Sequence, residues 1–372
     1  MQINTRLLKY IDWPMLVVVG ILLGIGLLAI ASATGAHVLN EGGTMHYVRK
    51  QIAAILAGVF VMVIIMAMNY EMFRRLTPLI YWGIIGLLII VLIPGIGKEV
   101  YGAQRWIPIG SFQLQPSEFA KIALVVALAD MLCRKQGLIQ NFFDLIPVLA
   151  YVGLPLVLIL RQPDLGTTMI MVVTTLAMLY VGNVKPAFLA GLTGAGLIGS
   201  PILWQLLKDY QRKRLLVFLN PAIDPLGDGY QIIQSRIAIG SGELWGQGLF
   251  AGTQNQLKFL PMRHTDFIFS VIGEEFGFIG GMLVLLLFFF FLWRGIRVAL
   301  EAKDLFGTIV AVGLVASIAF QMFINAGMAM GIMPVTGKTL PFISYGGTSV
   351  MSNLICVGLL QTIYMRRQKI MF

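Results

Sequence analysis

Residues 258–293 read KFLPMRHTDFIFSVIGEEFGFIGGMLVLLLFFFFLW, a polar beginning followed by a long apolar run. The apolar part, residues 267–293, is long enough to cross a hydrocarbon core of about 30 Å as a helix, which needs roughly 17–25 residues. The stretch therefore predicts a membrane-spanning helix whose entrance is charged. Four titratable side chains lie at that entrance: Lys258, Arg263, His264 and Asp266.

The chain as a whole has the composition of a membrane protein. Of its 372 residues, 58% are hydrophobic and 12% are charged, and its mean hydropathy is +0.85. A soluble domain usually has about 45–50% apolar and about 25% charged residues. We therefore expect an all-α polytopic membrane protein, a single integral membrane domain over residues 1–372, with about ten transmembrane helices. These are expected near residues 14–34, 51–68, 77–94, 117–132, 145–161, 165–182, 187–207, 267–293, 305–331 and 343–364.

Basic residues indicate the orientation of these spans. Lys and Arg in short loops stay on the cytoplasmic side. Of the basic residues outside the long loop, most lie at span ends on the same side of the predicted bundle, Arg74, Arg134 and Arg366 included. Both termini are therefore predicted to be cytoplasmic. The large loop between spans seven and eight, residues 208–266, is predicted to be extracytoplasmic. The net charge of +10 follows mostly from this loop-end bias, so no nucleic-acid partner is predicted.

Several charged residues fall inside or at the mouths of spans, where a charge costs about 2.5–3.5 kcal/mol at mid-membrane and marks a functional candidate. In QPSEFAKI, Glu118 and Lys121 are three residues apart and share one helix face. A structural ion pair and a substrate-binding role are both open for them. In RQPDLGT, Asp164 follows the fifth span, and this polar break leaves two full spans or a re-entrant pair open for residues 145–182. In GAQRWIPIG, Arg105 precedes an ordinary interfacial tryptophan.

The sequence SYGGTS, which begins at Ser344, places two glycines at the start of the last span. Backbone N–H groups at a helix start can approach an anion, whereas glycines there also permit close packing of helices. Both interpretations are open. They differ in whether the N–H groups face a ligand or another helix.

Asp266 is the acid at the entrance of the eighth span. A partly desolvated carboxylate has a raised pKa and is a stronger base when it is ionised. It would serve as a general base toward a sugar hydroxyl, or hold a divalent cation; a helix cap is the structural alternative. Basic side chains at the same level, namely Arg263, Lys258 and the cluster at residues 212–214, would bind phosphates of a lipid-linked substrate. Glu274 and Glu275 lie about two turns deeper, and at least one is expected to point inward.

The sequence LPMRHTDFIFSVIGEEFG, together with GAQRWIPIG, QPSEFAKI, QPDLGT, DPLGDGYQIIQSRIAIGSGELWGQG and TGKTLPFISYGG, resembles the SEDS family (shape, elongation, division and sporulation proteins). The resemblance extends over essentially the whole chain. Within the family, Arg263 directly before HTDF is more similar to the rod-shape elongation member than to the division member. The chain departs from the family pattern at Met262, where Glu is frequent, and at Thr348, where Ser is common.

This resemblance implies a peptidoglycan glycosyltransferase that acts during cell elongation. It would polymerise lipid II onto a growing glycan strand at the outer face of the bacterial cytoplasmic (inner) membrane, with Mg²⁺ or Mn²⁺ as cofactor, bound at Asp266 or nearby. The implied partners are a class B penicillin-binding protein and other membrane proteins of the elongation complex. The family assigns catalysis to Asp266 and places Glu118, Lys121 and Asp164 at a central cavity. The remaining candidates for substrate contact are Arg105, Lys258, Arg263, His264, Thr265 and Ser344.

Two other classes of protein share parts of this pattern. A flippase for lipid-linked precursors would also need many spans and intramembrane charges, and transporter folds often contain internal repeats. The halves of this chain contain no convincing repeat, and the polar residues concentrate toward one face. A non-catalytic elongation scaffold would tolerate neutralisation of Asp266.

Overall fold

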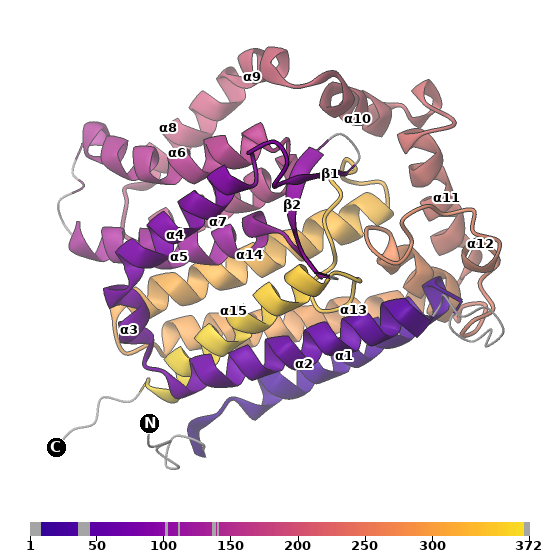
Figure 1. The fold of residues 1–372 in the computed structure, drawn as a ribbon, viewed down its shortest axis with the longest axis horizontal. Coiled ribbons are helices and arrows are strands. Elements are labelled where there is room, and N and C mark those ends of the chain that lie inside the picture. The colour runs from indigo at the N-terminus through magenta and orange to yellow at the C-terminus, as the bar shows by residue number, and fades with distance from the viewer. Residues whose placement is uncertain are drawn as a thin grey trace.

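In the computed structural model of the protein, residues 9–35, 45–100, 103–110, 112–135, 139 and 141–367 are described. The chain is a bundle of long helices with a folded layer at one end (Figure 1). Every predicted span contains a helix. The bundle helices are α1 (Trp13–Ala33), α2 (Met45–Ala67), α4 (Thr77–Ile90), α5 (Pro116–Arg134), α6 (Ile146–Arg161), α7 (Leu165–Val181), α8 (Pro186–Ile198), α9 (Ser200–Leu206), α13 (Ile268–Leu300), α14 (Leu305–Ala329) and α15 (Gly347–Met365).

One of the predicted spans differs in detail from the prediction. Within the described residues, six helices are long and apolar enough to cross a membrane, and the others are shorter or contain more charges. The seventh predicted span is broken into α8 and α9, because Pro201 at the start of α9 cannot donate the backbone hydrogen bond that would continue α8. Residues 145–182 form two separate helices, α6 and α7, joined by the turn at residues 162–164.

The two described ends of the chain meet at one end of the bundle. The backbone N–H of Asp12 donates to Gln361 Oε1 at 3.0 Å, and Gln361 Nε2 donates back to the Asp12 carbonyl at 2.9 Å. Arg294, near the end of α13, forms a buried ion pair of 2.8 Å with Asp12. The helices of the long loop lie at the opposite end (Figure 1). The two described ends therefore share one side, and the cytoplasmic assignment of that side stays a prediction.

Helix α5 lies at the centre of the bundle and is buried over most of its length. It packs against α4, α6, α7, α14 and α15. This position follows from its charges, because Glu118, Lys121 and Asp130 on a lipid-facing helix would each carry a large desolvation cost. Surrounded by protein, each of them is paired: Asp130 accepts from Arg74 at 3.0 Å and from Arg134 at 2.8 Å.

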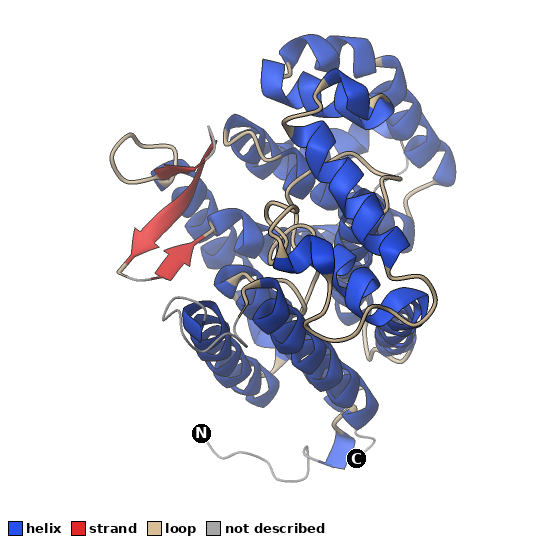
Figure 2. Cartoon of the chain, turned by 90° about the vertical axis from the view of Figure 1, so that its right-hand side faces the viewer, coloured by secondary structure: helices blue, strands red, loops and turns tan. Residues whose placement is uncertain are grey.

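The chain is mostly helical, as predicted, but three short strands lie between α4 and α5. These form an antiparallel sheet in the order β1 (Lys98–Val100), β2 (Ala103–Ile109) and β3 (Phe112–Leu114). Gly110, with φ of +58°, supplies the left-handed backbone that the turn after β2 needs. Figure 2 shows the strands at one edge of the helical bundle. Arg105 lies on β2, and α5 begins two residues after the end of β3.

The long loop at residues 208–266 is itself folded. It contains α10 (Asp209–Leu219), η3 (Pro221–Ile223), α11 (Asp228–Ser241) and α12 (Thr253–Gln256). Short helices α3 (Tyr70–Arg75) and η2 (Phe142–Leu145) complete the described elements, at other connections of the bundle. Helix α10 has the basic sequence that predicts a surface helix, and α11 packs on α13.

Candidate active site

Asp266 lies in a tight turn just before α13. The backbone N–H groups of Asp266 and Phe267 both donate to the Met262 carbonyl, at 3.1 and 3.3 Å. The N-cap position of α13 is Phe267, which has no side-chain cap, so the Asp266 carboxylate does not cap this helix. The helix-cap alternative is therefore wrong, and the carboxylate is left partly exposed at the entrance of the span.

A buried amide fixes the backbone of Asp266 against the loop that follows α14. Asn325 Nδ2 donates to the carbonyl of Asp266 at 2.8 Å and to the carbonyl of Lys338 at 2.6 Å. Asn325 is fully buried. One side chain of α14 thus joins two loops that are far apart in the sequence, and it holds Lys338 and its neighbour Gly337 beside Asp266.

Gly337 forms the floor between Asp266 and Arg214. A Cβ atom at this position would lie 3.5 Å from Asp266 Oδ2 and 4.0 Å from Arg214 Nη1. The φ of Gly337 is +68°, a conformation that other residues rarely adopt. The glycine therefore lets a carboxylate and a guanidinium approach the same point of the backbone from two different elements.

Burial raises the pKa of Asp266 to about 6, although the positive charges of Arg214, Lys338 and Arg105 act in the opposite direction. A carboxyl group with this pKa is mostly ionised at neutral pH. It is a stronger base than an exposed carboxylate, and a catalytic base works best with a pKa near the operating pH. The position suits proton abstraction.

A cleft lies next to this turn, and its lining is mostly apolar. Two cations, Arg214 of α10 and Arg105 of β2, also line it. Arg105 is held by the turn between α6 and α7, through a 2.9 Å bond from Nε to the Gln162 carbonyl and a second bond to Pro163. The other lining residues are Pro163, Leu165, Met169, Tyr210, Gln211, Leu215, Pro334, Val335 and Thr336.

Of the predicted basic cluster at residues 212–214, only Arg214 lines this cleft. Arg212 donates to backbone carbonyls at the end of α9, at 2.9 and 2.6 Å, and Lys213 pairs with Asp224 at 3.0 Å. Arg214 lies 3.4 Å from Asp228 and over the ring of Tyr210. It therefore faces inward, with one carboxylate partner on α11.

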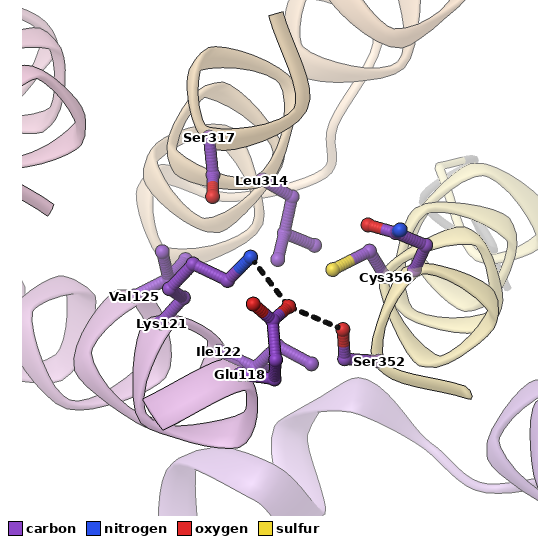
Figure 3. Close-up of a pocket in the computed structure, with 9 residues that line it drawn as sticks. Glu118, Lys121, Ile122, Val125, Leu314, Ser317, Ser352 and Cys356 are labelled. Atoms are coloured by element: carbon purple, nitrogen blue, oxygen red, sulfur yellow. Dashed lines mark hydrogen bonds and ion pairs between the residues drawn. The ribbon is translucent and has the colours of Figure 1, made fainter. Parts of the chain in front are cut away.

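Below the cleft, four charged side chains form a buried cluster. Glu118 lies 2.8 Å from Lys121 Nζ and 3.6 Å from Lys338 Nζ, and Lys338 Nζ lies 3.0 Å from Asp164 Oδ2. Two acids and two bases balance, so the cluster is neutral as a whole. Glu118 also accepts from Ser352 at 3.3 Å, next to a small cavity that Cys356 helps to line (Figure 3).

Asp164 anchors this cluster at the start of α7. Its carboxylate caps the helix, accepting the Thr167 N–H at 3.0 Å and the Thr167 hydroxyl at 2.8 Å. Lys121 reaches the opposite side of the cluster and donates to Gln321 Oε1 at 2.6 Å. Glu118 and Lys121 form an ion pair, as their spacing allows, and both line the small cavity, whereas Asp164 does not line it.

Sequence reasoning missed Lys338, which connects the cluster to the Asp266 turn. Only 3% of Lys338 is exposed. Its side chain passes Gly166, where a Cβ would lie 2.6 Å from Lys338 Cγ. A lysine in the apolar-flanked stretch TGKTLP was the available signal, since a lysine in such surroundings needs an acidic partner.

The other predicted contact residues support the Asp266 turn from outside the cleft. Arg263 donates to the Ala33 carbonyl at 2.6 Å, at the end of α1. His264 packs against Tyr47 and Tyr345, with ring centroids 5.1 and 5.7 Å away. The Thr265 carbonyl accepts from the Ser344 hydroxyl at 2.6 Å.

Two more sequence expectations concern Lys258 and the glycine pair. Lys258 is exposed in the turn after α12, with φ of +61°. The N–H of Gly346 donates to Gln51 Oε1 at 3.1 Å, and a Cβ on Gly347 would lie 2.7 Å from the Phe112 ring. Close packing, rather than an anion, accounts for these two glycines.

Both acids of the eighth span point inward, as predicted for at least one of them. Glu274 accepts the backbone N–H groups of Gln254 and Asn255, at 2.7 and 3.1 Å. Glu275 accepts from Asn255 Nδ2 at 3.0 Å and from the Ser32 hydroxyl of α1. The two carboxylates hold the α12 segment against the bundle.

These features define an integral membrane protein with a carboxylate and two guanidinium groups gathered at the end of the bundle away from the chain termini. The sequence profile of the FtsW/RodA/SpoVE family, described as "Cell cycle protein", matches residues 13–369. The chain belongs to this family, and the resemblance to SEDS proteins is thereby confirmed.

Three curated relatives show the range of the similarity. The chain is 42% identical to Stage V sporulation protein E of Bacillus subtilis, covering 94% of this chain and 95% of that protein. It is 38% identical to the probable peptidoglycan glycosyltransferase FtsW of Trichlorobacter lovleyi, covering 96% and 94%. It is 36% identical to the peptidoglycan glycosyltransferase MrdB of Escherichia coli, covering 96% and 95%. Because these identities are similar, they do not separate the elongation branch from the others.

Two solved structures share the fold. A chain from the study "Structural coordination of polymerization and crosslinking by a peptidoglycan synthase complex" superposes with a TM-score of 0.80 at 29% identity, covering 96% of this chain and 98% of that chain. The rod shape determining protein RodA of Thermus thermophilus superposes with a TM-score of 0.71 at 26% identity, also covering 96% and 98%.

Proposed function

We propose that this chain is a peptidoglycan glycosyltransferase that joins the disaccharide units of lipid II into β-1,4 glycan strands at the outer face of the cytoplasmic membrane. One observation carries the proposal: the partly buried carboxylate of Asp266 has Arg214, Lys338 and Arg105 as its charged neighbours, and two of these, Arg214 and Arg105, line the adjoining, mostly apolar cleft. A base, an anion-binding rim and an apolar surface are what a lipid diphosphate donor requires. The names of the relatives support the same chemistry.

The proposed reaction is a single displacement at the anomeric carbon of the donor. Asp266 accepts the proton of the 4-hydroxyl group on the GlcNAc of lipid II, and that oxygen attacks the anomeric carbon of the terminal MurNAc of the growing strand. The bond from this carbon to undecaprenyl diphosphate breaks as the new bond forms. Arg105 and Arg214 offset the charge on the leaving diphosphate. A single displacement inverts the donor, so an α-linked diphosphate becomes a β-1,4 bond.

The residues near Asp266 are compatible with Mg²⁺ or Mn²⁺ that is shared with the substrate. Within the described ranges, no group of three or more His, Cys, Asp or Glu side chains is placed to hold a metal ion. Mg²⁺ usually keeps several waters and binds through one or two carboxylates plus substrate phosphates. Asp266 would supply the carboxylate, and the bound cation would add positive charge at the diphosphate.

The buried cluster of Glu118, Lys121, Lys338 and Asp164 supports the reaction from below. Its ion pairs tie α5, α7 and the loop after α14 together under the Asp266 turn. The adjoining cavity has room for about one water molecule. No observation therefore favours passage of a lipid-linked disaccharide through this cluster, which a flippase would require.

A role in cell elongation, with a class B penicillin-binding protein as partner, is part of the proposal. The similarity to a chain of a peptidoglycan synthase complex supports a crosslinking partner. Arg263 directly before His264 and Asp266 supports the elongation branch by resemblance. Other elongation-complex membrane proteins would join the same assembly.

The test is glycan-strand formation from purified lipid II by the solubilised protein and its penicillin-binding partner, in Mg²⁺ or Mn²⁺, with the partner blocked by a β-lactam. Asp266→Asn is compared with Asp209→Asn, a neutralisation at a fully exposed acid of α10. We expect polymer from wild type and Asp209→Asn and none from an equally folded Asp266→Asn. Equal polymer from both variants would refute the role of Asp266, and none from wild type would favour the flippase or scaffold alternatives.

A further inference from the structure

Helix α13 consists of two parts with different surroundings. At Gly277 the backbone has φ of 65° and ψ of −162°, which is not helical. Before this break, nearly every residue from Ile268 to Glu275 is buried in protein. After it, large apolar side chains face outward, among them Phe278, Ile279, Met282, Leu283, Leu286 and Phe289. The outward apolar surface of this helix therefore begins at the break.

The lengths of the two parts match a membrane boundary at Gly277. The part from Phe278 to Leu300 has about 23 residues and spans about 35 Å, which covers a hydrocarbon core of about 30 Å. The part from Ile268 to Gly277 adds about 14 Å beyond it. Asp266 would then lie well outside the hydrocarbon, at the level of a sugar and its diphosphate.

The segment between α11 and α12 is fastened to the same break. The N–H groups of Phe278 and Ile279 donate to the carbonyls of Glu243 and Leu244, at 2.8 and 3.2 Å. In return, the N–H groups of residues 247 and 248 donate to the carbonyls of the two glutamates before the break, each at 3.0 Å. The backbone groups that α13 leaves unpaired are thus satisfied by this segment.

Close contact between the two backbones makes the junction rigid. Gly246 has φ of +83°, and a Cβ there would lie 2.2 Å from the Glu275 carbonyl oxygen. The segment therefore turns tightly against α13. Its apolar side chains point away: Trp245 is 80% exposed and Leu244 is 61% exposed, and Leu249 is exposed as well.

We propose that the turn at residues 244–249 is a membrane-interface anchor, in which Trp245 and its two leucine neighbours insert into the outer leaflet between headgroups and acyl chains. The occupant of this apolar surface is lipid, because the surface continues directly into the lipid-facing side of α13 at Phe278 and Ile279. Tryptophan prefers this interface, where its ring is apolar and its N–H stays near water. The placement holds whatever reaction Asp266 performs.

The anchor would fix the height of the active site above the membrane. The buried glutamates before the break connect the turn at residues 244–249 to α12 and α1, and α13 connects it to Asp266. A lipid contact at Trp245 would therefore be transmitted through a rigid segment rather than through a free loop.

The test uses nitroxide labels on single cysteines, in a background with Cys133→Ser and Cys356→Ala, reconstituted into lipid nanodiscs. Position 245 is compared with position 289 on the lipid-facing side of α13 and with the exposed position 209 on α10. We expect oxygen accessibility at 245 to resemble 289, and accessibility to a water-soluble nickel chelate to be several-fold lower than at 209. Nickel accessibility at 245 equal to that at 209 would overturn the proposal.

A second measurement uses the native side chain. Brominated lipids quench tryptophan fluorescence at short range, so the wild-type signal minus that of Trp245→Phe reports on Trp245 alone. We expect lipids with bromines near the headgroup end of the acyl chain to quench the Trp245 fluorescence strongly. The opposite result would be Trp245 fluorescence that brominated lipids leave unchanged and that the penicillin-binding partner alters. It would assign the surface to a protein and contradict the lipid anchor.

Discussion

Replacing Lys338 by Met would unbalance the buried cluster. Lys338 Nζ is the cation nearest Asp164, at 3.0 Å, and it also lies 3.6 Å from Glu118. Removing one partner of a buried pair strands the other charge and typically costs about 3–5 kcal/mol. We expect the free energy of unfolding of Lys338→Met to fall by about this amount, because Lys121 alone would then face two carboxylates.

The measurement is equilibrium unfolding in mixed detergent and SDS, as a double-mutant cycle with Asp164→Asn. Lys338→Met combined with Asp164→Asn should lose less than the sum of the two single changes, since neither charge is then stranded. Lys303→Met is the matched control, because its ion pair with Glu71 is solvent-exposed and should contribute about 1 kcal/mol or less.

The reasoning would be refuted by a loss below about 1 kcal/mol for Lys338→Met, or by strictly additive losses in the cycle. Either result would mean that water or local rearrangement compensates Asp164 and Glu118. The cluster would then not be a support of the Asp266 turn.

Two further predictions concern Asp266 and the adjacent Gly337. Asp266 acts as a base in its ionised form, and its pKa is about 6. The kcat/KM for polymerisation should therefore be constant above pH 6 and fall about tenfold per pH unit below it. A flat profile between pH 5 and 8 would contradict the assignment. Gly337→Ala should lower the free energy of unfolding by about 1–2 kcal/mol through its left-handed backbone. It should reduce polymerisation by more than this instability explains, because the added methyl group faces Asp266 and Arg214. Gly86→Ala, at a site with open space inside α4, should not lower the free energy of unfolding and should leave polymerisation unchanged.

The membrane spans could be predicted from the sequence because hydropathy is a local property. Every apolar run contains a helix, and the charges of α5 predict its burial. The break at Pro201 and the hairpin at Gly110 also have local signals, a proline and a glycine, but Pro201 lies inside an apolar run and the hairpin lies in a connection between two predicted spans. Composition alone therefore missed them.

The candidate site was predictable only in part. Asp266, Glu118, Lys121 and Asp164 are visible as charges in apolar surroundings. Lys338 is such a charge too, but its partner Asp164 lies 174 residues away. The expected phosphate contacts of Arg263 and Lys258 have no counterpart at the cleft, because Arg263 is engaged at the end of α1 and Lys258 is exposed.

The sequence by itself determined that the chain resides in a membrane, that it is mostly helical, and that a carboxylate stands at the entrance of one apolar helix. Only the tertiary structure decided what surrounds that carboxylate: Arg105 from a sheet, Arg214 from a loop helix, and Gly337 held in place by Asn325. The physical reason is distance. Transfer into lipid depends on the composition of each segment, whereas the charge and height of a site depend on contacts among segments that only packing brings together.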